Sequence, residues 1–175
     1  LIEEAITERT KCIVAVHYAG LSCDMEILTR IAKKHNLIMI EDAAQAIGSK
    51  YKKKFLGSIG DLGTFSFHET KNIHCGEGGA LLINKKEYFK RSTIIREKGT
   101  NRREFINGKI NKYEWVDLGS SYLPSELQAA FLFSQLSKLD EVNQLRLNIW
   151  NKYHKAFEFL EKDGLLSRPK VPAYN

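Results

Sequence analysis

The sequence predicts an α/β fold in which a central, mostly parallel β-sheet is flanked by helices. Two short apolar runs, Lys11–Tyr18 and Leu37–Glu41, enclose a segment, Asp24–His35, whose apolar residues recur at helical spacing. A strand, a helix and a second strand within about 30 residues form a βαβ unit, and such a unit has parallel strands. Two further strand-sized runs, Gly63–His68 and Ala80–Asn84, extend the predicted sheet.

The helix of this unit is marked by its charges as well as by its apolar stripe. Ile27, Leu28 and Ile31 form the stripe, while Asp24 lies in the first turn and Lys34 in the last. Acidic groups near the amino end and basic groups near the carboxyl end complement the helix dipole. This order of charges supports a helix that begins near Asp24.

The second half of the chain is predicted to be mainly helical. Lys85–Lys98 is expected to form a helix that ends at Gly99, and the polar segment Thr100–Asp117 is expected to be a long functional loop. Pro124 is suited to the first position of the next helix, where its missing N–H is not needed. One long helix, or two in tandem, should then run to Gly164.

Composition favours a folded protein and argues against a membrane location. The chain has 175 residues, 43% of them hydrophobic, which is enough for a real core. No apolar run is long enough to cross a bilayer, and the start Leu1-Ile2-Glu3-Glu4 does not resemble a signal peptide. Three cysteines without a CxxC pair fit a reducing compartment. We therefore expect a cytoplasmic protein, and both ends of the chain indicate a fragment of a longer one.

The basic charge needs a separate explanation. The net charge of +6 suggests a nucleic-acid partner, but the lysines are scattered among acidic residues and carry no RNA-binding or zinc-finger spacing. We expect no nucleic-acid partner, and a basic face would instead suit an anionic, phosphorylated substrate. The five histidines show no metal-ligand spacing, so no metal site is predicted.

Polar side chains follow the predicted strands where ligands of open α/β sheets bind. Asp42 comes directly after the strand Leu37–Glu41, Ser66 lies near the end of the next strand, and Lys71 follows three residues after His68. Each has a simpler explanation: Asp42 could cap a helix, and Lys71 could be an ordinary solvated lysine. Together, an acid and an amine at the mouth of a sheet favour Schiff-base chemistry, in which a desolvated lysine is the nucleophile.

Three stretches carry a resemblance to a known family. They are EDAAQAIGSKY at 41–51, FSFHETKNIHCGEGGALLIN at 65–84, and LGSSYLPSELQAA at 118–130. The chain resembles the DegT/DnrJ/EryC1/StrS sugar aminotransferases over nearly its whole length. These are fold-type I, aspartate aminotransferase-like enzymes that use pyridoxal 5′-phosphate. VHYAG at 16–20, REKGTNR at 96–102 and KYEWVDLGSSYL at 112–123 are similar to the enterobacterial-common-antigen branch, the dTDP-4-amino-4,6-dideoxygalactose transaminases.

The resemblance implies a role for each candidate residue. Lys71 would form the Schiff base with pyridoxal phosphate and later carry the proton, while Asp42 would pair with the pyridine nitrogen and keep it protonated. Gln45 would face the phenolic oxygen, and Ser66 would donate to the phosphate. Ser121 stands where many relatives have an asparagine that reaches the cofactor phosphate of the partner subunit. Leu123 replaces an arginine of the same pattern, so this role is weaker here.

The resemblance also implies a domain division and an activity. Residues 1–140 would be part of the large cofactor-binding domain, and residues 141–175 a long helix leading to a small C-terminal domain that is mostly absent. The full-length protein would be a homodimer. It would move an amino group from L-glutamate to C4 of a nucleotide-linked 4-keto-6-deoxyhexose, for enterobacterial common antigen, O-antigen or other lipopolysaccharide synthesis.

Two alternatives are also compatible with the sequence. The first is a pyridoxal-phosphate sugar dehydratase of the same fold, in which a histidine replaces the lysine found here as Lys71. The second is a non-catalytic regulatory or binding protein, suggested by the positive charge alone. The set of Asp42, Ser66 and Lys71 argues against the second, because a binding module has no use for it.

Overall fold

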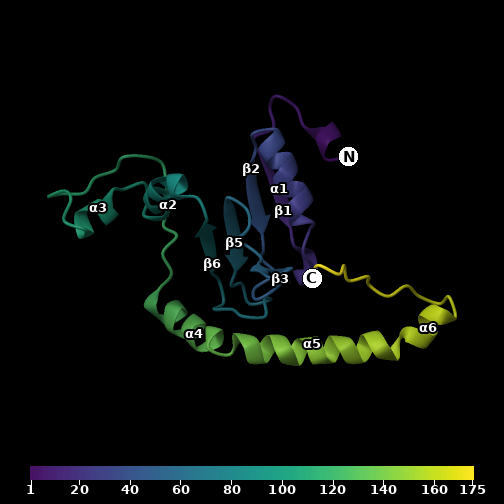
Figure 1. The fold of residues 1–175 in the computed structure, drawn as a ribbon. Coiled ribbons are helices and arrows are strands. Elements are labelled where there is room, and N and C mark those ends of the chain that lie inside the picture. Colours follow the sequence, from purple (N-terminus) through teal and green to yellow (C-terminus); the bar gives the residue numbers. More distant parts are fainter.

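The computed structural model describes residues 1–175 and contains the predicted sheet (Figure 1). Its strands are β1 (Cys12–Val16), β2 (Ile38–Asp42), β5 (Leu62–Ser66) and β6 (Gly79–Ile83), in the order β1-β2-β5-β6. The first three are parallel, and β6 is antiparallel to β5. The predicted α/β fold with a mostly parallel sheet is confirmed.

Helix α1 (Met25–Lys34) connects β1 to β2 and covers one face of the sheet. Asp24 is its N-cap, and the Asp24 side chain accepts a hydrogen bond from the N–H of Ile27 at 3.1 Å. A cap of this kind typically stabilises a helix by about 1 kcal/mol. The helix therefore begins where the charge pattern predicted.

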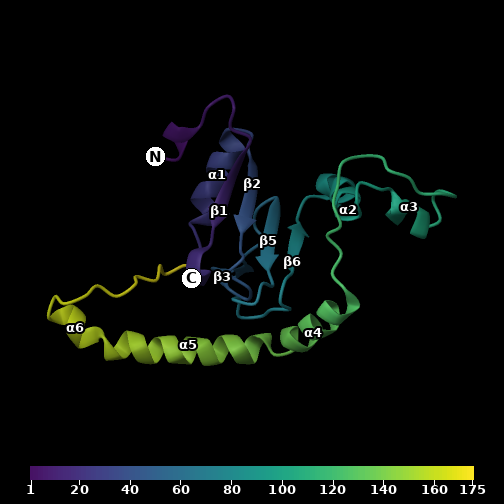
Figure 2. The same ribbon diagram turned by 180° about the vertical axis from the view of Figure 1, so that it is seen from behind.

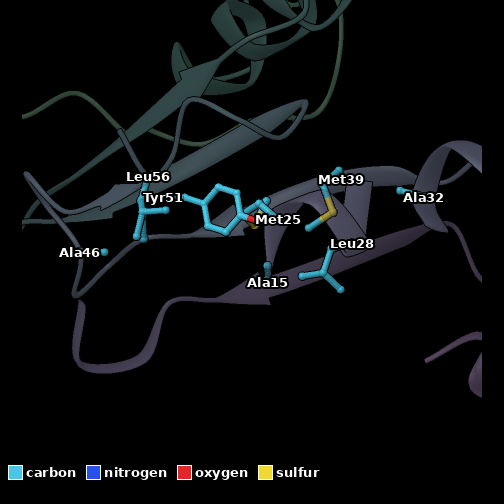
Figure 3. Packing of buried hydrophobic residues seen from close by; sticks show 9 residues of the cluster. Ala15, Met25, Leu28, Ala32, Met39, Ala46, Tyr51 and Leu56 are labelled. Carbon is cyan, nitrogen blue, oxygen red and sulfur yellow. The ribbon is translucent and has the colours of Figure 1, made fainter. Parts of the chain in front are cut away.

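The main hydrophobic core lies between α1 and the sheet and extends to the turns beyond β2 (Figure 3). Fully burying one Leu or Met side chain stabilises the fold by about 1.5–3 kcal/mol, so this core holds α1 against β1 and β2. Its nine buried members are Ala15, Met25, Leu28, Ala32, Met39, Ala43, Ala46, Tyr51 and Leu56.

A β-hairpin with strands of two residues contacts the C-terminal residues beside this core. The hairpin consists of β3 (Lys50–Tyr51) and β4 (Lys54–Phe55). The rings of Tyr51 and Tyr174 lie 5.0 Å apart, and the N–H of Lys52 donates to the carbonyl of Tyr174 at 2.6 Å. The chain therefore returns to the sheet after its long helical segment, as the yellow end in Figure 1 shows.

The segment after β6 differs in part from the sequence prediction. The helix expected over Lys85–Lys98 is a 3₁₀ turn, η3 (Lys86–Tyr88), followed by α2 (Phe89–Arg96). The expected loop at Thr100–Asp117 contains a five-residue helix, α3 (Arg102–Ile106). A helix this short gives too few turns for an apolar period to show in the sequence. Two more 3₁₀ turns, η1 (Glu3–Ala5) and η2 (Tyr18–Gly20), lie near the N-terminus.

Three helices in tandem form an arm that runs crosswise past the carboxyl ends of the parallel strands (Figure 2). They are α4 (Glu126–Leu136), α5 (Leu139–Ala156) and α6 (Glu158–Lys162). The first helix begins two residues later than Pro124 had suggested, because Ser125 is its N-cap and forms a capping box with Gln128. None of these helices contains a buried residue. No helix of the structure is long and apolar enough to span a membrane.

Candidate active site

The carboxyl ends of three parallel strands meet at one edge of the sheet. Asp42 is the last residue of β2, one position further into the strand than the sequence suggested, and Ser66 is the last residue of β5. Asp42 is the register partner of Val16 in β1 and of Thr64 in β5. Asp42 and Ser66 therefore lie at the edge where open α/β sheets bind their ligands.

The Asp42 carboxylate holds a turn and not a helix. Its Oδ1 accepts a hydrogen bond from the N–H of Ala44 at 3.1 Å, and no helix begins there. The alternative that Asp42 caps a helix is therefore wrong. The half-buried carboxylate makes no other hydrogen bond with the protein, so Oδ2 can accept one from a cationic N–H donor.

Gln45 lies in the turn that follows β2. Its Oε1 accepts a hydrogen bond from the N–H of Ala19 at 2.6 Å, which joins this turn to the loop after β1. The side chain makes no other hydrogen bond with the protein. Because the oxygen is the accepting atom, both amide hydrogens of Gln45 remain able to donate to a ligand.

Lys71 lies in the loop that joins β5 to β6. Its N–H donates to the carbonyl of His68 at 2.9 Å and closes a turn, while Ser66 Oγ at the start of the loop accepts from the N–H of His68 at 3.3 Å. The Lys71 side chain is half-buried, and its amine makes no hydrogen bond or ion pair with the protein. No protein group therefore competes with a ligand for this amine, whose neutral form is a nucleophile toward carbonyl groups.

Buried apolar residues fix the loop that carries Lys71. Ile73 is fully buried, and Phe67 and Cys75 retain only 6% and 8% of their exposure. These three side chains pack against the start of the helical arm, at Leu132, Leu139 and Val142. The helical arm therefore packs against the loop that carries Lys71. The spacing of residues in the sequence does not reveal this contact.

The glycines after Lys71 allow the loop to close on itself. The N–H of Phe67 donates to the carbonyl of Gly78 at 2.8 Å, and the N–H of Cys75 donates to the carbonyl of Phe67 at 2.9 Å. A Cβ on Gly78 would lie 2.7 Å from the sulfur of Cys75, and Gly76 has a φ of +83°. Both positions exclude larger residues, for steric and for backbone reasons respectively.

Ser121 lies apart from the other candidates. It lines a groove of about 440 Å³ between the lysine loop and α4, and the residues of this groove include Phe67 and Gly79 but neither Asp42 nor Lys71. The Ser121 backbone bridges to Glu97. Within this chain, the structure therefore does not bring Ser121 to the Asp42 edge.

Sequence reasoning missed two polar residues at the same edge, His17 and Glu41. Their side chains are bonded to each other and fully buried. A signal was available, because Glu41 is a charged residue at the end of an otherwise apolar strand run and His17 interrupts another. A charged residue is rarely buried unless it is paired.

The comparisons with known proteins decide the family. The sequence profile of the DegT/DnrJ/EryC1/StrS aminotransferase family matches residues 1–173. The chain belongs to this family. Among curated relatives of this DegT/DnrJ/EryC1/StrS chain, protein MJ1066 of Methanocaldococcus jannaschii is 40% identical over 169 residues, which is 95% of this chain and 43% of the relative. The spore coat polysaccharide biosynthesis protein SpsC of Bacillus subtilis is 37% identical over 160 residues, covering 90% of this chain and 41% of SpsC.

Solved structures of aminotransferases share the fold. An aminotransferase from Psychrobacter cryohalolentis superposes with a TM-score of 0.89 and 32% identity, over 97% of this chain and 44% of that one. PseC of Helicobacter pylori, an aminotransferase of pseudoaminic acid biosynthesis, superposes with a TM-score of 0.82 and 34% identity. The match covers 90% of this chain and 41% of PseC. The DegT/DnrJ/EryC1/StrS chain thus spans less than half the length of the proteins that it matches.

Pyridoxal 5′-phosphate is confirmed as the cofactor of the family. A putative sugar aminotransferase from Streptococcus pneumoniae, 28% identical to this chain, has been solved in pyridoxal-phosphate and pyridoxamine-phosphate forms. The residues of this chain fit such a cofactor by their free groups. Asp42 has an unused carboxylate oxygen, Gln45 has unused amide hydrogens, and the Lys71 amine is unpaired.

Proposed function

We propose that the full-length protein is a pyridoxal-phosphate-dependent aminotransferase that delivers an amino group from L-glutamate to C4 of a nucleotide-linked 4-keto-6-deoxyhexose. The observation that carries the proposal is the unpaired amine of Lys71, held in a loop that leaves the sheet edge beside Asp42 and Ser66. Membership of an aminotransferase family supports the reaction type.

Each of the four candidate residues would have a separate role at the cofactor. Asp42 would accept a hydrogen bond from the pyridine N–H and keep that nitrogen protonated, and Gln45 would donate one to the phenolic oxygen. Ser66 would donate a hydrogen bond to the phosphate, and the Lys71 amine would hold the cofactor and then carry the substrate proton. When bound, pyridoxal phosphate supplies the electron sink that makes this proton removable. The four side chains supply orientation, charge and the proton carrier.

The sugar class is supported by the names of relatives and by sequence motifs. SpsC belongs to spore coat polysaccharide biosynthesis and PseC to pseudoaminic acid biosynthesis. The VHYAG, REKGTNR and KYEWVDLGSSYL stretches favour a dTDP-4-amino-4,6-dideoxygalactose transaminase of enterobacterial common antigen or O-antigen synthesis. The net charge of +6 would attract the anionic diphosphate of such a substrate.

The proposal includes the assembly and location of the full-length protein. Residues 1–140 would form part of the large domain and residues 141–175 would lead to a small domain. A cytoplasmic homodimer would allow Ser121, which lies away from the Asp42 edge of its own chain, to approach the cofactor phosphate of the partner subunit. Light scattering on active full-length protein tests this assembly, and an active monomer would contradict it.

A sugar dehydratase of the same fold is the second candidate. It is disfavoured by Lys71, because in that branch a histidine takes this place. Anaerobic titration of the full-length protein separates the two functions. An aminotransferase is converted by L-glutamate from the pyridoxal to the pyridoxamine form, with release of 2-oxoglutarate. A dTDP-4-keto-6-deoxyhexose should then restore the first spectrum and yield the aminated sugar.

The same titration can contradict the proposal. A set of nucleotide-linked sugars, some without the C4 ketone, provides the control, because they should leave the pyridoxamine form unchanged. A product sugar that has lost a hydroxyl group and gained no amino group would show a dehydratase. The absence of any spectral change with glutamate would show that the donor or the reaction class is wrong.

A further inference from the structure

His17 and Glu41 form a buried polar pair next to the proposed cofactor-binding residues. His17 Nε2 lies 3.0 Å from Glu41 Oε2, and both side chains have 0% exposure. Ala15 of β1 is the register partner of Glu41, and His17 follows Ala15 by two residues. Since side chains alternate along a strand, His17 and Glu41 lie on one face of the sheet and Asp42 lies on the other.

The hydrogen bonds of His17 determine where its proton lies. Nδ1 accepts a hydrogen bond from the N–H of Cys23 at 3.2 Å, so this nitrogen carries no proton. Nε2 therefore holds the proton and donates a hydrogen bond to Oε2 of Glu41. The ring is neutral and its orientation is fixed, because one nitrogen is hydrogen-bonded to the loop before α1 and the other is hydrogen-bonded to β2.

Glu41 accepts hydrogen bonds from four donors. Besides His17, the N–H of Gly57 donates to Oε2 at 2.8 Å, and the N–H groups of Ile59 and Gly60 donate to Oε1, both at 2.6 Å. Burial raises the pKa of Glu41, but the bonds from His17, Gly60, Gly57 and Ile59 lower it by more, so the net pKa lies below its ordinary value. Glu41 is therefore a satisfied carboxylate that joins β2 to the loop before β5.

The backbone beside this pair leads directly to the proposed site. The N–H of His17 donates to the carbonyl of Asp42 at 3.0 Å, and the N–H of Ala19 donates to the Gln45 side chain at 2.6 Å. The ring of His17 thus holds a loop whose backbone contacts both residues. Movement of this loop would move Asp42 and Gln45 together.

We propose that His17 and Glu41 are a positioning pair that sets the directions of Asp42 and Gln45 toward the pyridine ring. The inference rests on the proposed function, because it needs a ring at this edge. Stability alone does not explain the pair, since replacing both partners of a buried hydrogen bond by apolar groups of the same shape is often nearly neutral. A hydrogen-bonded pair instead fixes geometry, and a misplacement of about 1 Å can cost on the order of 100-fold in rate.

Two substitutions of His17 separate its two hydrogen bonds. His17→Asn keeps an acceptor near Nδ1 for Cys23 and loses the donor to Glu41, whereas the longer amide of His17→Gln reaches Glu41. Leu28→Ala is the control, because Leu28 is 7% exposed in the core and the cavity should cost about 2–5 kcal/mol of stability without touching the pair. All variants are made in the full-length protein and compared at a temperature where each is folded.

We expect His17→Asn to shift the absorbance maximum of the bound cofactor and to lower kcat on the order of tenfold to 100-fold, with the KM for the amino donor nearly unchanged. His17→Gln should recover most of both signals. In the cofactor-free protein, amide exchange at Ala19 should accelerate in His17→Asn and not in Leu28→Ala. Leu28→Ala should keep the normal spectrum despite its lower melting temperature.

Two results would overturn the inference, and they are distinguishable. If His17→Asn keeps the spectrum and kcat of the unaltered protein, or changes them only as much as Leu28→Ala does, the pair is structural and the positioning role is wrong. If the unaltered protein carries no pyridoxyl group on Lys71 after borohydride reduction, the proposed function fails first and this inference fails with it.

Discussion

Asp42 of β2 and Thr64 of β5 are register partners in adjacent parallel strands. Partners in register point to the same face of a sheet, and Ser66 lies two residues beyond Thr64 on that face. Asp42 and Ser66 therefore share one face and one edge before any loop is placed. The side chains of His17 and Glu41 lie on the opposite face of the sheet, at the same carboxyl end of β2.

Asp42 should be required for turnover and not for folding. Asp42→Asn retains the bond from Ala44 but loses the charge that keeps the pyridine nitrogen protonated, so kcat should fall at least on the order of 100-fold, or about 2.7 kcal/mol of barrier. Asp61→Asn is the matched control. Asp61 pairs with Lys85 at 2.9 Å and accepts from Met39 at the other end of the strands, so this change should affect stability and leave kcat intact. Steady-state kinetics on both variants test this role. Near-normal turnover of Asp42→Asn would contradict the assignment of Asp42 as the partner of the ring nitrogen.

Lys71 should be the residue that carries the cofactor. Borohydride reduction and peptide mass mapping should place the pyridoxyl group on Lys71, and Lys71→Ala should lose both the label and transamination. Lys53→Ala, which removes an exposed lysine, should keep both and change stability by less than about 0.5 kcal/mol. A pyridoxyl group on a different lysine would contradict the site as proposed.

Glu41 should stabilise the fold in a pH-dependent way. Glu41→Gln replaces one accepting oxygen by an amide that faces backbone donors, and it should cost about 3 kcal/mol at neutral pH. The pKa of Glu41 is lowered in the folded state, so the stabilisation is complete above its unfolded value of about 4.3 and is lost as the pH falls toward the folded value. Urea unfolding should show a constant gap between variant and unaltered protein from about pH 7 to 5, and a narrowing gap below about pH 4. A gap that widens on acidification would reverse the assigned direction.

Two glycines with similar backbones should respond differently to alanine. Gly99 and Gly108 have φ values of +75° and +68°. A Cβ at Gly99 would lie 1.9 Å from the carbonyl oxygen of Asp117, whereas nothing lies within 4 Å at Gly108. Gly108→Ala should therefore cost about 1 kcal/mol from backbone strain alone, and Gly99→Ala considerably more. Urea unfolding measures both costs, and equal costs would show that the segment carrying Ser121 can move away from Gly99.

The local sequence pattern was sufficient to predict some of the helices and strands and not others. The β1, α1 and β2 unit was predicted within one or two residues of its bounds, because apolar runs and the Asp24 cap are properties of adjacent residues. Helix α3 was missed because five residues carry no readable period. The start of α4 was misplaced because Ser125 and Gln128 form a capping box after Pro124.

The sequence by itself determined the chemistry available to this protein: a lysine and an aspartate at strand ends, the glycines behind them, and the motifs of an aminotransferase family. The tertiary structure decided which of these groups are free. It leaves the Lys71 amine unpaired, supports its loop on Leu132 and Leu139, and places Ser121 in a separate groove. It alone revealed the His17–Glu41 pair, whose members are 24 residues apart and meet only because β1 and β2 are parallel neighbours. Contacts between distant residues depend on strand order and register, which are set by packing of the whole sheet and not by local sequence.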